Sequence, residues 1–183
     1  MNDPDTVRAD TERWLVRAVI GLNLCPFAKA VQAKGLIRIA VSDARRDEAL
    51  LEELGRELDE LVALDAGERE TTLLVAPHCL AEFLDFHEFT GRAERLLRKR
   101  GLDGVIQLAT FHPAFQFAGT DAGDVTNFSN RSPYPTLHLL RESSIDRAVQ
   151  AFPEAAAIYE TNMETLRRLG PQGWAALDVG ASP

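Results

Sequence analysis

The spacing of apolar positions divides the chain into segments with helical periodicity and segments with extended periodicity. Helical segments, in which apolar residues recur every three or four positions, begin near Asp3, Pro26, Asp43, Leu80, Ser143 and Pro153. Short runs rich in β-branched and aliphatic residues lie between them, over 36–41, 71–76, 105–111 and 136–140. The pattern therefore predicts helices that alternate with up to four short strands.

Capping residues and prolines define the first two helices. Asp3 is suited to cap the first helix, and Pro4 is suited to its first turn, where no backbone N–H is needed. That helix must end before Pro26, because the residue before a proline disfavours the helical conformation. We expect Pro26 to begin a short second helix with Cys25 as its N-cap and Gly35 just after its end.

Later segments follow the same logic. Asp43 is the expected cap of a helix whose buried face consists of leucines from Leu50 to Leu61. The last helix should open at Pro153 and end at Gly170, and the tail, 171–183, should be weakly structured, with Trp174 and Leu177 as its docking residues.

The order of elements predicts one α/β domain spanning 1–183. Strands separated by helix-length segments are typical of βαβ units, in which the strands run parallel. Near-continuous apolar strands also fit a sheet that is covered on both faces. We therefore expect a mostly parallel sheet of three to four strands flanked by helices, with the direction of the strand at 136–140 left open.

Residues 112–135 break the pattern, with three prolines, two glycines and no clear period. So long a connection in a compact domain is usually either functional or disordered. Its concentration of phenylalanine and tyrosine argues against disorder. Because it leaves the carboxyl end of a predicted parallel strand, where α/β proteins bind ligands, we predict a ligand-binding or catalytic loop. The alternative is a packed loop that only covers the sheet edge.

Composition and charge exclude several classes of protein. The chain of 183 residues has a formal net charge of −8, which disfavours binding to nucleic acids and to anionic membranes. No apolar run approaches the roughly 20 residues of a membrane span, and the polar N-terminal segment does not resemble a signal peptide. Two cysteines far apart do not form a disulfide framework. These features favour a cytoplasmic protein.

Three segments together resemble a family of bacterial proteins, domain-of-unknown-function family 1415. They are residues 22–28 (LNLCPFA), residues 111–119 (FHPAFQFAG) and residues 130–142 (NRSPYPTLHLLRE). The resemblance spans nearly the whole chain and implies one intact domain in a bacterial cytoplasm. It implies no activity, cofactor or catalytic residue.

Cys25 is the sharpest chemical candidate. A thiol at a helix N-terminus faces unsatisfied N–H groups and the positive end of the helix dipole, so we expect a lowered pKa and a reactive thiolate. The alternative is a buried cysteine that packs as a small apolar residue, which the neighbouring Leu22, Leu24 and Phe27 favour.

Histidines supply candidate bases and metal ligands. His112 follows the third predicted strand and could act as a base for a thiol, or could simply hydrogen-bond the loop backbone. His138 lies in the fourth predicted strand, on a face that could belong to the core or to a site. Cys25, His112 and His138 are ligand types that suit zinc or iron, but they lack any local ligand spacing.

Polar residues of the loop are the candidate substrate ligands. Arg131 between Asn130 and Ser132 suits the bidentate capture of a carboxylate or phosphate, and Gln116 lies in the adjacent motif. The alternative is an arginine that fastens the loop to its own backbone carbonyls, to Asp121 or to Asp124.

These observations lead to one main hypothesis and two alternatives. The main hypothesis is a small enzyme acting on a small anionic metabolite, with Cys25 as nucleophile or redox thiol and His112 as base. Arg131 and Asn130 would anchor the anion, and Ser132, His138 and Gln116 would complete the substrate site. The alternatives are a non-catalytic module that binds a metabolite or a protein, and a metalloprotein with cysteine and histidine ligands. The sequence predicts neither a cofactor nor an oligomeric state.

Overall fold

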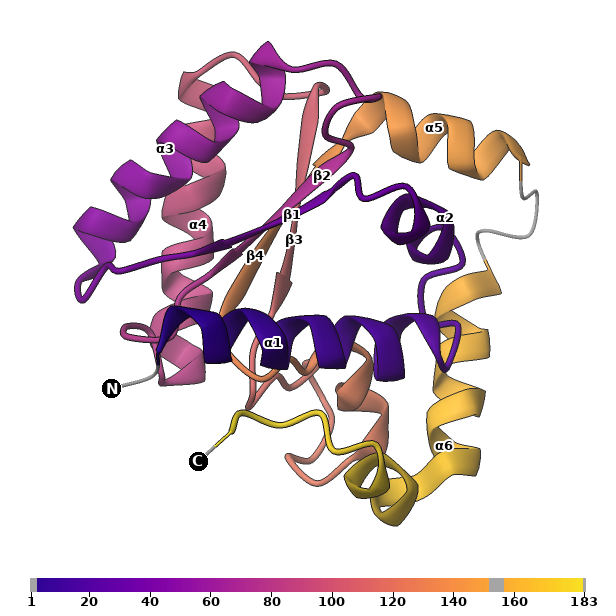
Figure 1. The fold of residues 1–183 in the computed structure, drawn as a ribbon. Coiled ribbons are helices and arrows are strands. Elements are labelled where there is room, and N and C mark those ends of the chain that lie inside the picture. The colour runs from indigo at the N-terminus through magenta and orange to yellow at the C-terminus, as the bar shows by residue number, and fades with distance from the viewer. Residues whose placement is uncertain (1–2, 152–156, 183) are drawn as a thin grey trace.

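A computed structural model of the chain describes residues 3–151 and 157–182, which form helices around a four-stranded sheet (Figure 1). The strands are β1 (Ile37–Val41), β2 (Thr71–Val75), β3 (Ile106–Phe111) and β4 (Thr136–Arg141). Their order across the sheet is β1-β2-β4-β3. Every strand falls within one or two residues of a segment that the short apolar runs predict.

The sheet is mixed, so the expectation of a mostly parallel sheet is only partly right. Strands β1 and β2 are parallel, whereas β4 runs antiparallel to both of its neighbours, β2 and β3. The chain therefore returns through β4 beside β3, and residues 112–135 join these two neighbours instead of leading to another parallel strand.

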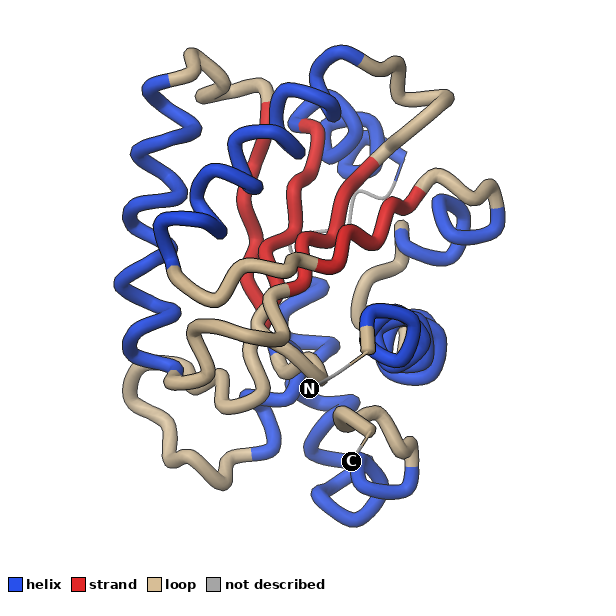
Figure 2. Tube along the Cα trace, turned by 60° about the vertical axis from the view of Figure 1, so that its left-hand side comes forward, coloured by secondary structure: helices blue, strands red, loops and turns tan. Residues whose placement is uncertain are grey.

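Two long helices, α3 (Asp47–Ala63) and α4 (Phe83–Lys99), cover one face of the sheet (Figure 2). The leucines at 50, 54, 58 and 61 recur at helical spacing and are all buried, which confirms the predicted inner face of α3. They pack with Phe86 and Phe89 of α4 against the strands. Full burial of each such side chain contributes about 1.5–3 kcal/mol.

The other face carries α1 (Pro4–Trp14) and its continuation, the π-helical segment η1 (Leu15–Ile20). Asp3 caps α1 through a hydrogen bond from the Thr6 backbone N–H, as the sequence predicts. Val7, Trp14 and Ala18 are buried against the sheet. The short helix α2 (Ala28–Ala33) and helix α5 (Glu142–Ala151) lie on this same side (Figure 1).

Helix starts differ from the sequence prediction at three places. The N-cap of α3 is Arg46 and not the predicted Asp43, and the helix begins at Asp47; before it, Ser42 accepts a hydrogen bond from the Ala44 N–H at 3.0 Å. Helix α4 begins at Phe83 and α2 at Ala28, each a few residues later than predicted.

Helix α6 (Ile158–Ala176) and the residues after it are more ordered than the sequence predicts. The expected helix start at Pro153 lies outside the described residues. The helix is interrupted at Gly170, as the sequence predicts, because its φ of 69° and ψ of 173° are non-helical, and a further helical segment then continues to Ala176. Beyond it, the carboxylate of the buried Asp10 accepts hydrogen bonds from the N–H and hydroxyl of Ser182, from the Tyr134 hydroxyl and from Arg13. The prediction of a weakly structured tail is therefore wrong for the described residues 171–182.

Residues 112–135 form an ordered loop built around the 3₁₀ helix η2 (Val125–Asn130), against which α6 packs. At its centre, the buried Asn127 Oδ1 accepts hydrogen bonds from the Phe117 N–H and the Thr120 hydroxyl, both at 2.9 Å. None of the helices within residues 3–151 and 157–182 has the length and apolar character of a membrane span.

Candidate functional site

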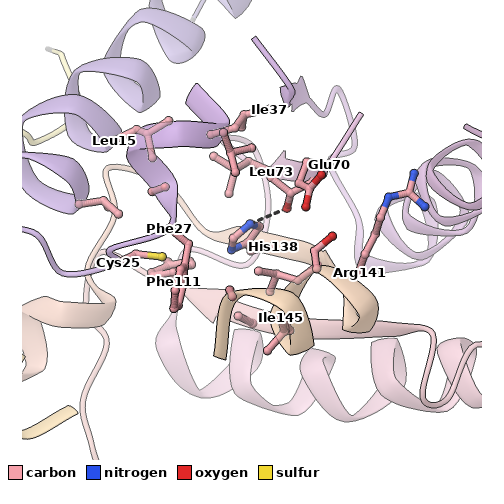
Figure 3. A pocket seen from close by; sticks show the side chains of 18 of the residues that line it. Leu15, Cys25, Phe27, Ile37, Glu70, Leu73, Phe111, His138, Arg141 and Ile145 are labelled. Atoms are coloured by element: carbon pink, nitrogen blue, oxygen red, sulfur yellow. Dashed lines mark hydrogen bonds between the residues drawn. The ribbon is translucent and has the colours of Figure 1, made fainter. Parts of the chain in front are cut away.

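A cavity of about 350 Å³ lies on the α1 side of the sheet, where η1, α2 and α5 leave the strands uncovered (Figure 3). Its floor is the sheet, through Leu73, Ala109, Phe111 and Leu140. Its walls come from Leu15 and Val19 of η1, from Phe27, Ala28 and Val31 at α2, and from Ile145 and Ala148 of α5. Nearly all of these side chains are apolar, so the cavity favours apolar contents.

Two charged residues that line the cavity, Arg141 and Glu70, bind other parts of the chain with their charged groups. The Arg141 guanidinium donates to the carbonyls of Leu61, Leu64 and Arg69 and so satisfies the C-terminal end of α3. The Glu70 carboxylate pairs with Arg147 at 3.2 Å. The polar groups left to face the cavity include Cys25 and His138, which lie on different elements (Figure 3).

His138 lies in the middle of the sheet, opposite Leu73 of β2 and Ala109 of β3. Its Nε2 is 2.7 Å from the Thr71 hydroxyl oxygen. Burial of the ring disfavours the imidazolium and lowers the pKa of His138 to about 4. The imidazole in the cavity is therefore neutral at physiological pH.

Cys25 reaches the cavity because the chain leaves η1 abruptly. The Leu24 N–H donates back to the Val19 carbonyl at 2.9 Å, and Asn23 adopts a left-handed φ of 55°. Asn162 of α6 fixes this turn from outside by donating its amide N–H to the Leu24 carbonyl. Asparagine adopts this left-handed conformation more readily than most residues other than glycine, so Asn23 is suited to the turn.

The environment of Cys25 differs from the predicted one. The thiol does not cap a helix starting at Pro26, because α2 begins only at Ala28. Burial raises the pKa of Cys25, and hydrogen bonds from the backbone N–H groups of Phe27 and Ala28 only partly oppose this effect. The expectation of a lowered pKa is therefore wrong in direction, and the resting group is a thiol.

His112 does not line this cavity. It follows β3 as predicted, but its ring is fully buried against Phe83 and Phe86 of α4. Its Nδ1 accepts from the Ala114 N–H at 3.0 Å, and its Nε2 lies 3.1 Å from the Leu80 carbonyl. Both nitrogens are engaged with backbone, so this arrangement corresponds to the structural alternative for His112.

Arg131 and Asn130 also bind the loop itself. Arg131 donates to the carbonyls of Phe115 and Ala122 at 3.2 and 2.6 Å, and its guanidinium stacks 4.6 Å above the Phe128 ring. Asn130 donates to the Thr110 carbonyl at 3.2 Å. The arginine therefore fastens the loop, as the structural alternative states.

The remaining loop candidates make local contacts as well. The Ser132 hydroxyl donates to the Tyr134 carbonyl at 2.6 Å, and the Gln116 amide donates to the Thr120 carbonyl. Of the residues that the sequence singles out, only Cys25 and His138 line the same cavity.

The structure adds residues that the sequence analysis missed. Thr71 reads as an ordinary strand residue, yet its hydroxyl contacts His138. The π-helical turn of η1 has no sequence signal, although such turns frequently mark functional sites.

The metal hypothesis can also be compared with the structure. Within the described part of the chain, no three His, Cys, Asp or Glu side chains are arranged as a metal site. Cys25, His112 and His138 thus do not form one.

The fold and the cavity define a mixed α/β protein with an apolar pocket between its sheet and one helical layer. Residues 6–176 match the family described as "Protein of unknown function (DUF1415)", and the chain belongs to that family. No curated protein and no solved structure matches it.

Proposed function

We propose that this protein binds a small, mainly apolar organic molecule in the cavity between η1, α2, α5 and the sheet. The observation that carries the proposal is the apolar lining of a cavity of about 350 Å³ that also contains a neutral imidazole and a thiol. Ligand pockets typically have volumes from about 300 to 1,000 Å³ and combine apolar walls with a few polar groups.

The volume indicates the size of the ligand. An apolar cavity of about 150 Å³ is enough to bind benzene. A cavity of about 350 Å³ is therefore suited to a molecule with two to three aromatic rings, or to a branched aliphatic chain of similar size. The absence of an available guanidinium among the described cavity residues argues against a small anion as the occupant, because Arg141 is bound to α3 carbonyls.

The local backbone supports a binding role. An α-helix that widens into a π-helical turn loses regular hydrogen bonding, and such turns are frequent at functional sites. Here the π-helical turn directs Leu15 and Val19 at the cavity, and the left-handed Asn23 then returns the chain so that Cys25 lines it.

Binding can be tested with N-phenyl-1-naphthylamine, whose fluorescence rises in apolar surroundings. We expect a saturable rise with one site per chain. Ala148→Phe should abolish it, because Ala148 lines the cavity. The matched control is Val149→Phe, since Val149 is 45% exposed and does not line the cavity. Absence of saturable binding by the wild-type chain, or equal binding by both variants, would contradict the proposal.

A second function, thiol chemistry on the bound molecule, is favoured by one observation. Cys25 and His138 line the same cavity, and two backbone N–H groups donate to the Cys25 sulfur, where they would stabilise negative charge. Since the resting group is a thiol, deprotonation would have to accompany ligand binding. Cys25→Ser should then retain binding of N-phenyl-1-naphthylamine but lose covalent labelling by a naphthyl-substituted haloacetamide, as read by mass spectrometry. Equal labelling of wild type and variant would exclude this function.

A further inference from the structure

The hydroxyl of Thr71 lies between two groups and has only one proton to donate. Its oxygen is 2.6 Å from the Leu139 carbonyl oxygen and 2.7 Å from His138 Nε2. Two oxygens at 2.6 Å require a proton between them, and only the hydroxyl can supply it. The Thr71 hydroxyl therefore donates to Leu139 and accepts from His138, so Nε2 carries the ring proton.

The second ring nitrogen of His138 must then be unprotonated. Neutral imidazole has one N–H, and that N–H is at Nε2. No hydrogen bond to Nδ1 is found among residues 3–151 and 157–182, and the ring lines the cavity (Figure 3). The lowered pKa of His138 keeps this nitrogen unprotonated across the neutral range. The cavity thus contains an acceptor lone pair in apolar surroundings.

We propose that the molecule bound in this cavity carries a neutral hydrogen-bond donor, such as a phenolic or aliphatic hydroxyl, which donates to His138 Nδ1. This inference rests on the proposed function and names the class of ligand. It also assigns Thr71 as the residue that sets the preference, because Thr71 fixes which nitrogen carries the proton. An ether offers no proton to Nδ1, and a carboxylate would bring a charge and a second acceptor into an apolar site.

Three naphthalenes of matched shape test the inference by calorimetry: 2-naphthol, 2-methoxynaphthalene and 2-naphthoate. We expect 2-naphthol to bind about three- to tenfold more tightly than the ether, as one net hydrogen bond predicts. The carboxylate should bind at least about a hundredfold more weakly than 2-naphthol, because burial of an unpaired charge is costly.

Variants of β2 connect the preference to Thr71. In Thr71→Val the imidazole proton is no longer held at Nε2, so the preference for 2-naphthol over the ether should fall to about twofold or less. Thr71→Ser keeps the hydroxyl and should retain the preference. Thr72→Val is the matched control, since Thr72 is the next residue of the strand and does not line the cavity.

The outcomes separate this inference from the proposed function. Equal affinity for 2-naphthol and the ether would overturn the inference while leaving a binding cavity in place. If none of the three binds, the proposed function fails together with it. Nitrogen-15 spectra of the His138 ring give a test without ligand: a protonated Nδ1 in the wild-type chain would overturn the inference whether or not any naphthalene binds.

Discussion

Two adjacent threonines of β2 lead to opposite predictions for the same substitution. Thr71 and Thr72 are both buried, but they point to opposite faces of the sheet. The Thr71 hydroxyl contacts His138 and Leu139, whereas the Thr72 hydroxyl has no hydrogen-bond partner in the described part of the chain. Valine has nearly the shape of threonine without the hydroxyl, so Thr→Val isolates the contribution of each hydrogen-bonding group.

The expected magnitudes follow from the cost of burying a polar group. A buried hydroxyl without a partner destabilises the folded state by about 1–3 kcal/mol. Thr72→Val removes such a group and should raise the free energy of unfolding by about 1–2 kcal/mol. For a chain of 183 residues this corresponds to an increase in Tm of roughly 2–8 °C. Thr71→Val leaves His138 Nε2 and the Leu139 carbonyl without the hydroxyl that they contact, and should lower the free energy of unfolding by about 1–3 kcal/mol.

Urea denaturation followed by tryptophan fluorescence measures both effects. Trp14 is buried between α1 and the sheet, where its ring meets the Phe111 ring edge-on at 5.1 Å, so unfolding will change its emission. The denaturant dependence should be unchanged in both variants, because neither alters the surface exposed on unfolding. A Thr72→Val chain that is less stable than wild type would show that the hydroxyl is satisfied and that the reasoning is wrong.

Three further predictions concern Asp10, Cys25 and Arg131. Burial alone would raise the pKa of Asp10, but hydrogen bonds from Ser182, Tyr134 and Arg13 lower it overall. The contribution of Asp10 to the free energy of unfolding should therefore be complete above about pH 4 and fade as the pH falls through the lowered pKa. Asp10→Asn should weaken this loss of stability at acid pH, as measured by urea titrations at several pH values. If the variant loses as much stability at acid pH as the wild type, Asp10 is not the group responsible. Because burial raises the pKa of Cys25, alkylation by iodoacetamide should be slow at pH 7 and still accelerate beyond pH 9, and a plateau near neutral pH, measured by mass spectrometry, would contradict this. Arg131→Ala removes two hydrogen bonds and a ring contact and should lower the free energy of unfolding by about 1–3 kcal/mol, while binding of N-phenyl-1-naphthylamine stays within twofold of wild type. Wild-type stability in that variant would mean that the loop does not depend on this arginine.

Local periodicity was enough to predict most elements of this fold. The leucines of α3 and the apolar runs of the strands specify their own type of structure, because burial of one face is a local pattern. The direction of β4 is different. A strand with buried residues on both faces looks the same in either direction, and only its pairing with β2 and β3 makes it antiparallel.

The candidate site was predictable only in part. Cys25 and His138 stand out as residue types, and the structure brings them to one cavity. The sequence cannot show that His112 contacts the Leu80 carbonyl or that Arg131 donates to the Phe115 carbonyl, since these partners lie on other segments of the chain. Thr71 is invisible to sequence reasoning, because a threonine in a strand is ordinary until its neighbour across the sheet is known.

The position of β4 between β2 and β3 has a consequence for how the molecule assembles. Among the described strands β4 comes last in sequence, yet it lies inside the sheet, so neither β2 nor β3 has its inner neighbour until residues 136–141 are in place. During synthesis β2 and β3 therefore have unpaired backbone N–H and C=O groups along one edge until β4 is made, and such edges are prone to mispairing. His138 lies on this late strand, so a nascent chain that ends before residue 136 lacks the imidazole that lines the cavity, and the α5 residues of the cavity wall follow later still.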